Sequence, residues 1–378
     1  MERAVFGIIG AGGIAQSQHL PNLTRAPHVR LKAVCDLDAA KLRAAQQKYG
    51  IPEATADHAA LLADEEIHAV VVATREDQQA RLSLEALRAG KHVYVEKPVG
   101  GTPEEVEQVV AAQRETGRFV AVGFNRRFAP AYRKAHELIG AHGGAHNIHY
   151  RISDEYWDWG RSYPPGVRLI HEICHVFDVI RWLTGSDAES VYCVASRPDD
   201  EVIALKMRSG CVASIMNSGY VTVDLPKERL EAVTERGAVT VEDFVELRTY
   251  GLAGCEAVYR FAGHSHPDRE MTHKFLLART GEDGLRALRR MAWELRERVR
   301  DAGQDDAEAR EIRRYLGERA MTWNYMMDKG WLAAVDHFAQ CVLSGAEPEN
   351  ATASDALAAS RLARAAIESR ETGRPVRP

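Results

Sequence analysis

Cysteine is scarce in this 378-residue chain, which contains six widely spaced cysteines. No two of them form a C-x-x-C pair; they are Cys35, Cys174, Cys193, Cys211, Cys255 and Cys341. The pattern therefore favours reduced, mostly buried thiols over a disulfide framework or a cysteine-rich zinc cluster.

Long apolar runs and a strong excess of one charge are also missing. No run approaches the ~20 residues of a transmembrane helix. The net charge is −5 with 27% charged residues, which gives no sign of a nucleic-acid partner. An apolar strand pattern starts within a few residues of Met1 and leaves no room for a secretory signal, so we expect a cytoplasmic protein. With 45% hydrophobic residues, the length suits two domain cores.

What the first third does contain is an alternation of apolar strands and amphipathic helices. Strands are expected at residues 5–9, 30–35, 69–73, 92–95 and 119–122. Helices are expected at residues 78–89 and 103–115, and from the cap Asp36-Leu37-Asp38 to a stop at Gly50. The alternation predicts βαβ units and a doubly wound parallel sheet, an α/β Rossmann domain over residues 1–122.

A glycine-rich loop follows the first expected strand. Residues 10–15 (GAGGIA) match G-x-G-x-x-G/A, with a strand before the motif and a helix after it. Gly10 allows the tight turn, Gly12 lets the backbone approach a pyrophosphate, and Ala15 permits close helix–strand packing. The helix N-terminus offers unpaired N–H groups to the phosphates. The loop predicts a dinucleotide site that includes Gly10, Gly12, Gly13 and Ile14.

Asp36 indicates which dinucleotide binds. It ends the second strand about 20 residues after the loop, where a carboxylate accepts hydrogen bonds from the adenosine ribose. A 2′-phosphate would face this negative charge, and Leu37 supplies no compensating cation. The sequence therefore predicts NAD, with NADP disfavoured. The alternative role of Asp36 is to cap the next helix, for which Asp38 is equally well placed.

Glu96-Lys97-Pro98 follows the strand at residues 92–95. A strand end running into E-K-P after a Rossmann glycine loop resembles the glucose-fructose oxidoreductase / inositol dehydrogenase / MocA family. Further segments of that family are resembled by Ala73-Thr74 with residues 79–93 (QARLSLEALRAGKHV), by residues 123–128 (GFNRRF) and by residues 172–185 (EICHVFDVIRWLTG). The resemblance covers nearly the whole chain except about residues 260–325. It implies an NAD(P)-dependent oxidoreductase that acts on a CH–OH group of a sugar, sugar derivative or cyclitol. It also implies cofactor contacts at Thr74, Glu96 and Lys97.

Lys97 is expected to act on the substrate. The carboxyl ends of parallel strands face the ligand crevice, so its ammonium would lie near the reacting carbon–oxygen bond. A partly desolvated lysine exchanges protons with a hydroxyl readily. The resemblance makes Lys97 a catalytic or substrate-orienting residue; the alternative is a surface lysine at a strand end.

Residues 171–175 (HEICH) have the H-E-x-x-H spacing of zinc enzymes. On one helix this spacing puts both imidazoles on the same face, with the glutamate as general base. The extension H-x-x-G-x-x-H is absent, so we expect no metal, and a zinc hydrolase is a remote alternative.

The resemblance gives the same segment another role. His175 becomes the general acid/base that works with Lys97, and an ordinary imidazole pKa of ~6.5 suits this. Glu172 joins the proton relay, Asp178 orients the His175 ring, and His171 contacts substrate. His171 stands where many members have aspartate; Arg75 and Gln79 also depart from the family pattern, which weakens any transfer of substrate identity.

After residue 122 the pattern changes to short β-rich segments. They lie at residues 145–151, 190–196, 201–207, 212–217, 228–232 and 238–241. We expect an α+β domain over residues 123–378 with a large open, mostly antiparallel sheet. The resemblance implies a dimer or tetramer formed through that sheet. Arg126, Tyr156 and Trp157 are candidate substrate contacts, since aromatic faces beside polar groups suit sugar rings.

A charged helical insertion at about residues 265–325 has apolar residues at helical spacing, which requires one packed side. They are Leu285, Leu288, Met291, Ala292 and Leu295. A lid over the substrate and an oligomer contact both stay open. Two alternatives also remain for the chain as a whole. One is transient oxidation by tightly held NAD in elimination or glycoside cleavage, and the other is a non-catalytic dinucleotide sensor.

Overall fold

The computed structural model describes residues 2–155, 164, 166–262, 277–314 and 327–378. Tyr156 and Trp157, two candidate substrate contacts, lie outside these residues. The chain divides into two compact units. The first comprises Met1–Phe128, Ile170–Asp178 and Gly330–Arg364, and the second comprises Ala129–Leu169, Val179–Lys329 and Ala365–Pro378.

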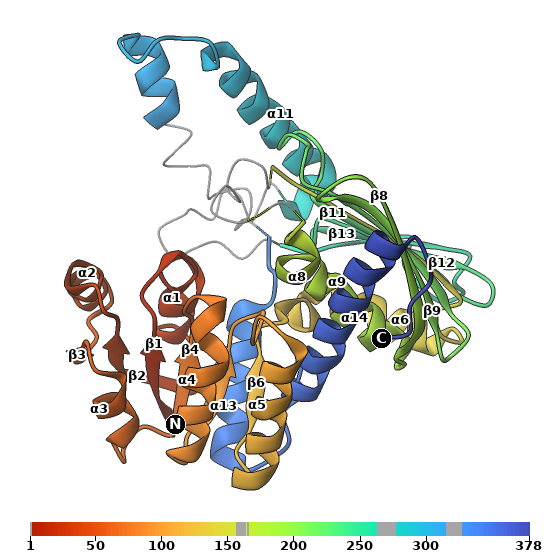
Figure 1. Ribbon diagram of the computed structural model, residues 1–378. Helices are drawn as coiled ribbons and strands as arrows, with labels where there is room; N and C mark the ends of the chain where they lie inside the picture. Colours follow the sequence, from red (N-terminus) through yellow and green to blue (C-terminus); the bar gives the residue numbers. More distant parts are fainter. Residues whose placement is uncertain (1, 156–163, 165, 263–276, 315–326) are drawn as a thin grey trace. The chain divides into compact units, whose positions relative to one another are not determined.

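The first unit is built on a parallel sheet of six strands in the order β3-β2-β1-β4-β5-β6 (Figure 1). The strands are β1 (Ala4–Ile9), β2 (Val29–Cys35), β3 (Glu53–Thr55), β4 (Ala69–Val72), β5 (His92–Val95) and β6 (Val120–Val122). The predicted doubly wound sheet is confirmed. Because the strand order reverses between β1 and β4, the carboxyl ends of these two strands form the edge at which such sheets bind ligands.

The helices between these strands begin and end at recognisable signals. They are α2 (Ala39–Tyr49), α3 (His58–Ala63), α4 (Glu76–Arg88) and α5 (Pro103–Thr116). Asp38 caps α2 by accepting the N–H groups of Ala40 and Lys41, and Gly50 ends it at φ +64°. Asp38 is thus the capping residue, which leaves Asp36 available for another role.

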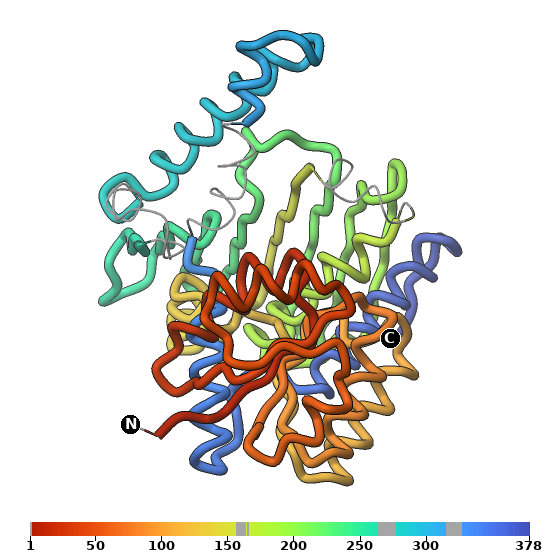
Figure 2. Tube along the Cα trace, turned by 90° about the vertical axis from the view of Figure 1, so that its left-hand side faces the viewer, coloured from red at the N-terminus to blue at the C-terminus, as the bar shows by residue number. Residues whose placement is uncertain are grey.

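Residues from the C-terminal third complete the core of this unit. Helix α13 (Trp331–Ser344) packs on β1 and β5 (Figures 1 and 2). The Phe338 ring lies edge-on to Phe6 and Tyr94, with centroids 6.2 and 6.0 Å apart. The expected division placed all of residues 123–378 in a second domain. The compact units divide the chain differently, because α13 buries its apolar face in the first core.

The second unit contains a sheet of eight strands in the order β14-β13-β12-β11-β7-β10-β9-β8. They are β7 (Asn147–Ser153), β8 (Ala188–Arg197), β9 (Asp200–Met207), β10 (Val212–Ser218), β11 (Glu228–Val233), β12 (Ala238–Glu242), β13 (Glu246–Tyr250) and β14 (Val258–Arg260). Strands β7 and β10 pair in parallel and the other neighbours are antiparallel. The predicted mostly antiparallel sheet is confirmed, with β13 and β14 as additional strands.

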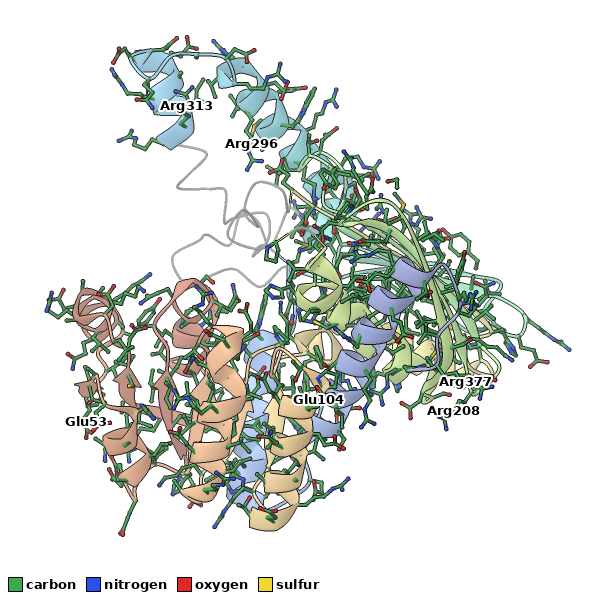
Figure 3. The ribbon with its side chains drawn as sticks, viewed as in Figure 1. Glu53, Glu104, Arg208, Arg296, Arg313 and Arg377 are labelled. Atoms are coloured by element: carbon green, nitrogen blue, oxygen red, sulfur yellow. The ribbon has the colours of Figure 1, made fainter. Side chains whose placement is uncertain are left out.

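The charged insertion forms α11 (Glu282–Val299) and a second helical stretch at residues 307–314. Leu285 and Ala292 are buried, whereas Met291 is 40% exposed. Arg313 ties the second stretch to the first by donating to the carbonyls of Val299 and Ala302, at 2.8 and 2.7 Å (Figure 3). One side of α11 therefore packs, as its apolar spacing predicts.

A buried charged cluster anchors the start of α11. The Arg289 guanidinium pairs with the Asp243 carboxylate, and both side chains are buried. Glu282 is buried beside them, and its carboxylate accepts no hydrogen bond from the described residues. The Nε of Arg286 lies 3.8 Å from its Oε1. Burial, and then the charge of Asp243, raise the pKa of Glu282 to about 8.

This shift predicts a pH-dependent stability. The folded-state pKa of Glu282 exceeds the unfolded value of about 4.3, so the folded chain binds the extra proton between these values. The free energy of unfolding therefore falls as pH rises through this window. Glu282→Gln is expected to flatten the dependence and to raise the melting temperature at pH 8.5, measured by thermal denaturation from pH 5 to 9. The exposed neighbour Glu294→Gln is the control; parallel curves for wild type and Glu282→Gln would contradict the explanation.

Candidate active site

The glycine loop lies at the carboxyl end of β1, in a conformation that requires glycine. Gly10 has φ +105°, and a Cβ there would lie 2.2 Å from the Ala73 carbonyl oxygen. Thr74 lies against the same turn, with its Cγ2 3.2 Å from that Cβ position. Residues 13–23 are helical and include a π-helical turn, Ala15–His19, before α1 (Leu20–Leu23). The predicted strand–loop–helix arrangement is confirmed; the π turn was not anticipated.

The space around the loop fits a dinucleotide. A Cβ on Gly12 or Gly13 would meet no described atom within 4 Å, so the backbone there is open to a pyrophosphate. The first turn of the following helix presents its N–H groups at the same place, and Ile14 begins that turn. The residues present therefore suit the group that the motif predicts.

Asp36 places a carboxylate beside this loop. Its Oδ2 accepts the Ala11 N–H at 2.7 Å, and its Oδ1 accepts the Asp38 N–H at 2.9 Å. The adjacent Leu37 is 90% exposed and brings no positive charge. Asp36 therefore contributes a fixed negative charge at the end of β2.

Lys97 follows β5 and is held by a segment far away in sequence. Its Nζ donates to the His171 carbonyl oxygen at 2.7 Å, across 74 positions of the chain. Gln79, a departure from the family pattern, supports the same turn by donating from Nε2 to the Pro98 carbonyl at 2.9 Å. The structure thus brings Lys97 together with the histidine-containing segment inside the first unit.

The helix that would align the two histidines is interrupted. Helix α8 (Arg168–His171) ends before Glu172, which lies in a turn, and α9 (Ile173–Thr184) begins after it. The H-E-x-x-H spacing therefore does not put His171 and His175 on one face of a continuous helix, which corrects that part of the zinc interpretation. Within the described residues, no group of three histidine, cysteine or acidic side chains is arranged to hold a metal ion.

The residues around this break are buried. The His175 ring is 6% exposed and packs edge-on to Phe124, with centroids 5.7 Å apart. His171 Nε2 lies 3.5 Å from Glu76 Oε1, and Glu172 Oε1 lies 3.9 Å from Arg126 Nη2. The neighbouring thiol is not a nucleophile, because burial raises the pKa of Cys174 to about 12.

Asp178 is paired with Arg127, an arginine of the segment GFNRRF. Arg127 donates from Nε to Asp178 Oδ2 at 3.0 Å and from Nη2 to Oδ1 at 2.5 Å. Arg127 also lies 3.2 Å from Asp355, whose other oxygen accepts the Thr352 N–H. Asp178 is fully buried. The expected role in orienting His175 stays a prediction, while the observed contacts make Asp178 a partner of Arg127.

A Rossmann sheet with a glycine loop at the carboxyl end of its first strand is the arrangement of dinucleotide-binding domains. A family described as "Oxidoreductase family, NAD-binding Rossmann fold" (GFO_IDH_MocA) matches residues 5–124. The inositol 2-dehydrogenase of Rubrobacter xylanophilus is 32% identical over 258 residues, which cover 64% of this chain and 72% of that protein. The chain therefore belongs to the glucose-fructose oxidoreductase / inositol dehydrogenase / MocA family.

One further relative and one solved structure are similar to this chain. The uncharacterized oxidoreductase YrbE of Bacillus subtilis is 29% identical over 263 residues, or 64% of this chain and 74% of YrbE. The scyllo-inositol dehydrogenase of Lactobacillus casei, solved with NAD(H) and scyllo-inositol, superposes with a TM-score of 0.72 at 19% identity. That alignment covers 100% of this chain and 99% of the other, which shows that the two share their fold.

Among the described residues, no helix combines the length and apolar character needed to cross a membrane.

Proposed function

We propose that this chain uses NAD to oxidise a secondary hydroxyl of a cyclitol, sugar or sugar derivative, or to catalyse the reverse reaction. The observation that carries the proposal is the 2.7 Å hydrogen bond between Lys97 and the His171 carbonyl. It joins the lysine at the end of β5 to the segment that contains His175. The names of the relatives, inositol 2-dehydrogenase and scyllo-inositol dehydrogenase, support a polyhydroxylated ring as substrate.

The residues at the strand ends would hold the cofactor. Gly10, Gly12 and Gly13, with the helix that begins at Ile14, would receive the pyrophosphate, and Asp36 would accept hydrogen bonds from the adenosine ribose. When bound, the nicotinamide supplies the acceptor for the substrate's hydride. Thr74 lies against the loop, which supports a contact with the cofactor there.

Lys97 and His175 would manage the proton. A hydroxyl must lose its proton as the carbon is oxidised, and a positioned base accelerates that step. We assign the base to the His175 imidazole and the orientation of the hydroxyl oxygen to the Lys97 ammonium. The His171 carbonyl occupies one of the three ammonium donors and leaves two for substrate. Arg126 and the His171 ring are further proposed substrate contacts, and Glu172 is proposed to join the proton relay.

The test begins with cofactor binding. Quenching of tryptophan fluorescence by NAD gives its affinity, and a panel of inositols, aldoses and sugar nucleotides then identifies substrates by the absorbance of reduced nicotinamide. Absence of binding by either NAD or NADP would sink the proposal. Product formed without accumulated NADH would replace it by the transient-oxidation reaction.

Asp36 is expected to decide between the two dinucleotides. A 2′-phosphate about 4 Å from this carboxylate is opposed by several kcal/mol at an effective dielectric constant near 20. We therefore expect wild type to bind NAD at least ~10-fold more tightly than NADP, a difference of about 1.4 kcal/mol. Asp36→Ser combined with Leu37→Arg should reverse much of the preference, measured by the same fluorescence titration. Asp38→Asn, which removes a nearby charge but keeps the cap, should leave it unchanged; equal affinities in wild type would contradict the assignment.

The second unit's sheet offers a surface for self-association. Val194, Val202 and Met216 are directly opposite one another on β8, β9 and β10, and they are 45%, 52% and 40% exposed. An apolar row of this kind on an open sheet is typical of a protein interface. We expect a dimer or tetramer by sedimentation velocity, and dissociation in Val202→Glu. Arg208→Glu, in the turn after β9 (Figure 3), is the matched control; a monomeric wild type would contradict the proposal.

A further inference from the structure

A buried histidine lies two hydrogen bonds from the proposed catalytic lysine. His19 ends the π-helical turn after the glycine loop, and its side chain is 3% exposed. Its Nε2 lies 2.8 Å from Oε1 of Glu96, which is equally buried. A carboxylate taken out of water needs such a partner, because an unpaired buried charge is strongly destabilising.

The other oxygen of Glu96 is directed at the lysine. Oε2 accepts the Lys97 backbone N–H at 3.1 Å, so one carboxylate contacts both His19 and Lys97. Gly123 lies directly against the same carboxylate, since a Cβ built on Gly123 would be 2.8 Å from Glu96 Oε1. The Glu96 N–H is in turn fixed to the Val72 carbonyl at 2.9 Å. The carboxylate therefore has little freedom to move.

These contacts connect the glycine loop to Lys97. The loop leads into the π turn, the π turn ends at His19, and His19 is bound to Glu96. Glu96 holds the Lys97 backbone, and the Lys97 side chain reaches the His171 carbonyl. All of these residues belong to the first unit.

We infer that His19 and Glu96 form a positioning pair. The pair fixes the position of Lys97 relative to the glycine loop and to the segment that contains His171 and His175. The inference deepens the proposed function, because it takes Lys97 as the residue that orients the hydroxyl. It also gives Glu96 a different role from the cofactor contact that the family resemblance implies. The Glu96 side chain is only 7% exposed, and its two oxygens lie against His19, the Lys97 backbone and Gly123.

The first measurement needs neither cofactor nor substrate. His19→Gln and Glu96→Gln keep hydrogen-bonding groups of similar size but replace the histidine–carboxylate hydrogen bond. In the cofactor-free protein, reductive methylation of Lys97, followed by mass spectrometry of its peptide, should be severalfold faster in both variants than in wild type. If NAD-dependent turnover exists, kcat should fall by up to ~10²-fold, as expected for a misplaced catalytic group. The NAD affinity should change little.

Two controls separate positioning from general loss of stability. His28 and Asp336 form another histidine–carboxylate pair of the first unit, with Nδ1 and Oδ2 3.0 Å apart. His28→Gln should destabilise the protein without changing Lys97 methylation. The double variant His19→Gln/Glu96→Gln should match the single variants, because coupled residues are not additive.

Three results would overturn the inference. Unchanged Lys97 methylation in both variants excludes positioning, whether or not the chain turns over a sugar or cyclitol. A large loss of NAD affinity with unchanged methylation makes Glu96 a cofactor ligand instead. If Lys97 methylation accelerates equally in His28→Gln, the His19–Glu96 pair contributes to stability only and does not position Lys97. If Lys97 methylation is faster in both variants but the wild-type protein binds no NAD, the positioning pair is supported and only the proposed function is rejected.

Discussion

Lys97→Met is expected to lower kcat by about 10²–10³-fold, the usual range for removing a positioned hydrogen-bond donor to the reacting oxygen. Methionine has a similar length and no charge, so the β5 end should keep its shape while the bond to the His171 carbonyl disappears. The glycine loop and Asp36 do not depend on the ammonium. NAD affinity should therefore stay nearly constant. Steady-state kinetics on the substrate found by the panel, together with fluorescence titration of NAD, check both expectations.

The chain contains a matched control for this substitution. Lys91 is buried in the first unit and, like Lys97, donates from Nζ to a backbone carbonyl, that of Asp64, at 2.6 Å. It precedes β5, whereas Lys97 follows it, so it lies at the opposite end of the strand from the ligand edge. Lys91→Met loses an equivalent hydrogen bond and should leave kcat unchanged. Wild-type turnover in Lys97→Met, or an equal loss in Lys91→Met, would remove Lys97 from the reaction.

The parallel sheet was predictable because four of its strands, β1, β4, β5 and β6, are buried along almost their whole length. Such strands are continuous apolar runs, and residues 69–73 are recognisable for that reason. Capping residues predicted where helices begin and end, as Asp38 and Gly50 do at the two ends of α2. Strands β3, β13 and β14 were not predicted: they have three, five and three residues, and a periodic pattern is hard to recognise over so few. Strand β6 is equally short, but its wholly apolar sequence (VAV) marks it.

The candidate site was predictable only where its parts are local. The glycine loop and Asp36 are defined by positions near the ends of two successive strands. The contact between Lys97 and the His171 carbonyl joins residues 74 positions apart, and it depends on tertiary packing that no periodicity encodes. The same is true of α13, whose apolar face gives no indication of which sheet it covers. The break in the helix at Glu172 is also tertiary in origin, because H-E-x-x-H has no helix-breaking residue.

Arg127→Met is expected to destabilise the first unit by about 3–5 kcal/mol, the range for removing one partner of a buried ion pair. Asp178 is 0% exposed, and Arg127 contacts both of its oxygens. Burial alone would favour a neutral guanidine, yet the carboxylates of Asp178 and Asp355 outweigh it and raise the pKa of Arg127. Methionine fills a similar volume without the charge, so the loss measures the pair and not a cavity. Urea denaturation followed by circular dichroism gives the change in the free energy of unfolding.

Variants of the partners identify the source of that loss. Asp355→Asn removes only the second, partly exposed contact of Arg127 and should cost about 1 kcal/mol or less. Arg127→Met combined with Asp178→Leu removes both buried charges and should recover much of the stability lost by Arg127→Met, because no uncompensated carboxylate then remains. If the double variant is as unstable as the sum of the single ones, the two residues act independently. Asp178 would then return to its predicted role beside His175, one helical turn away.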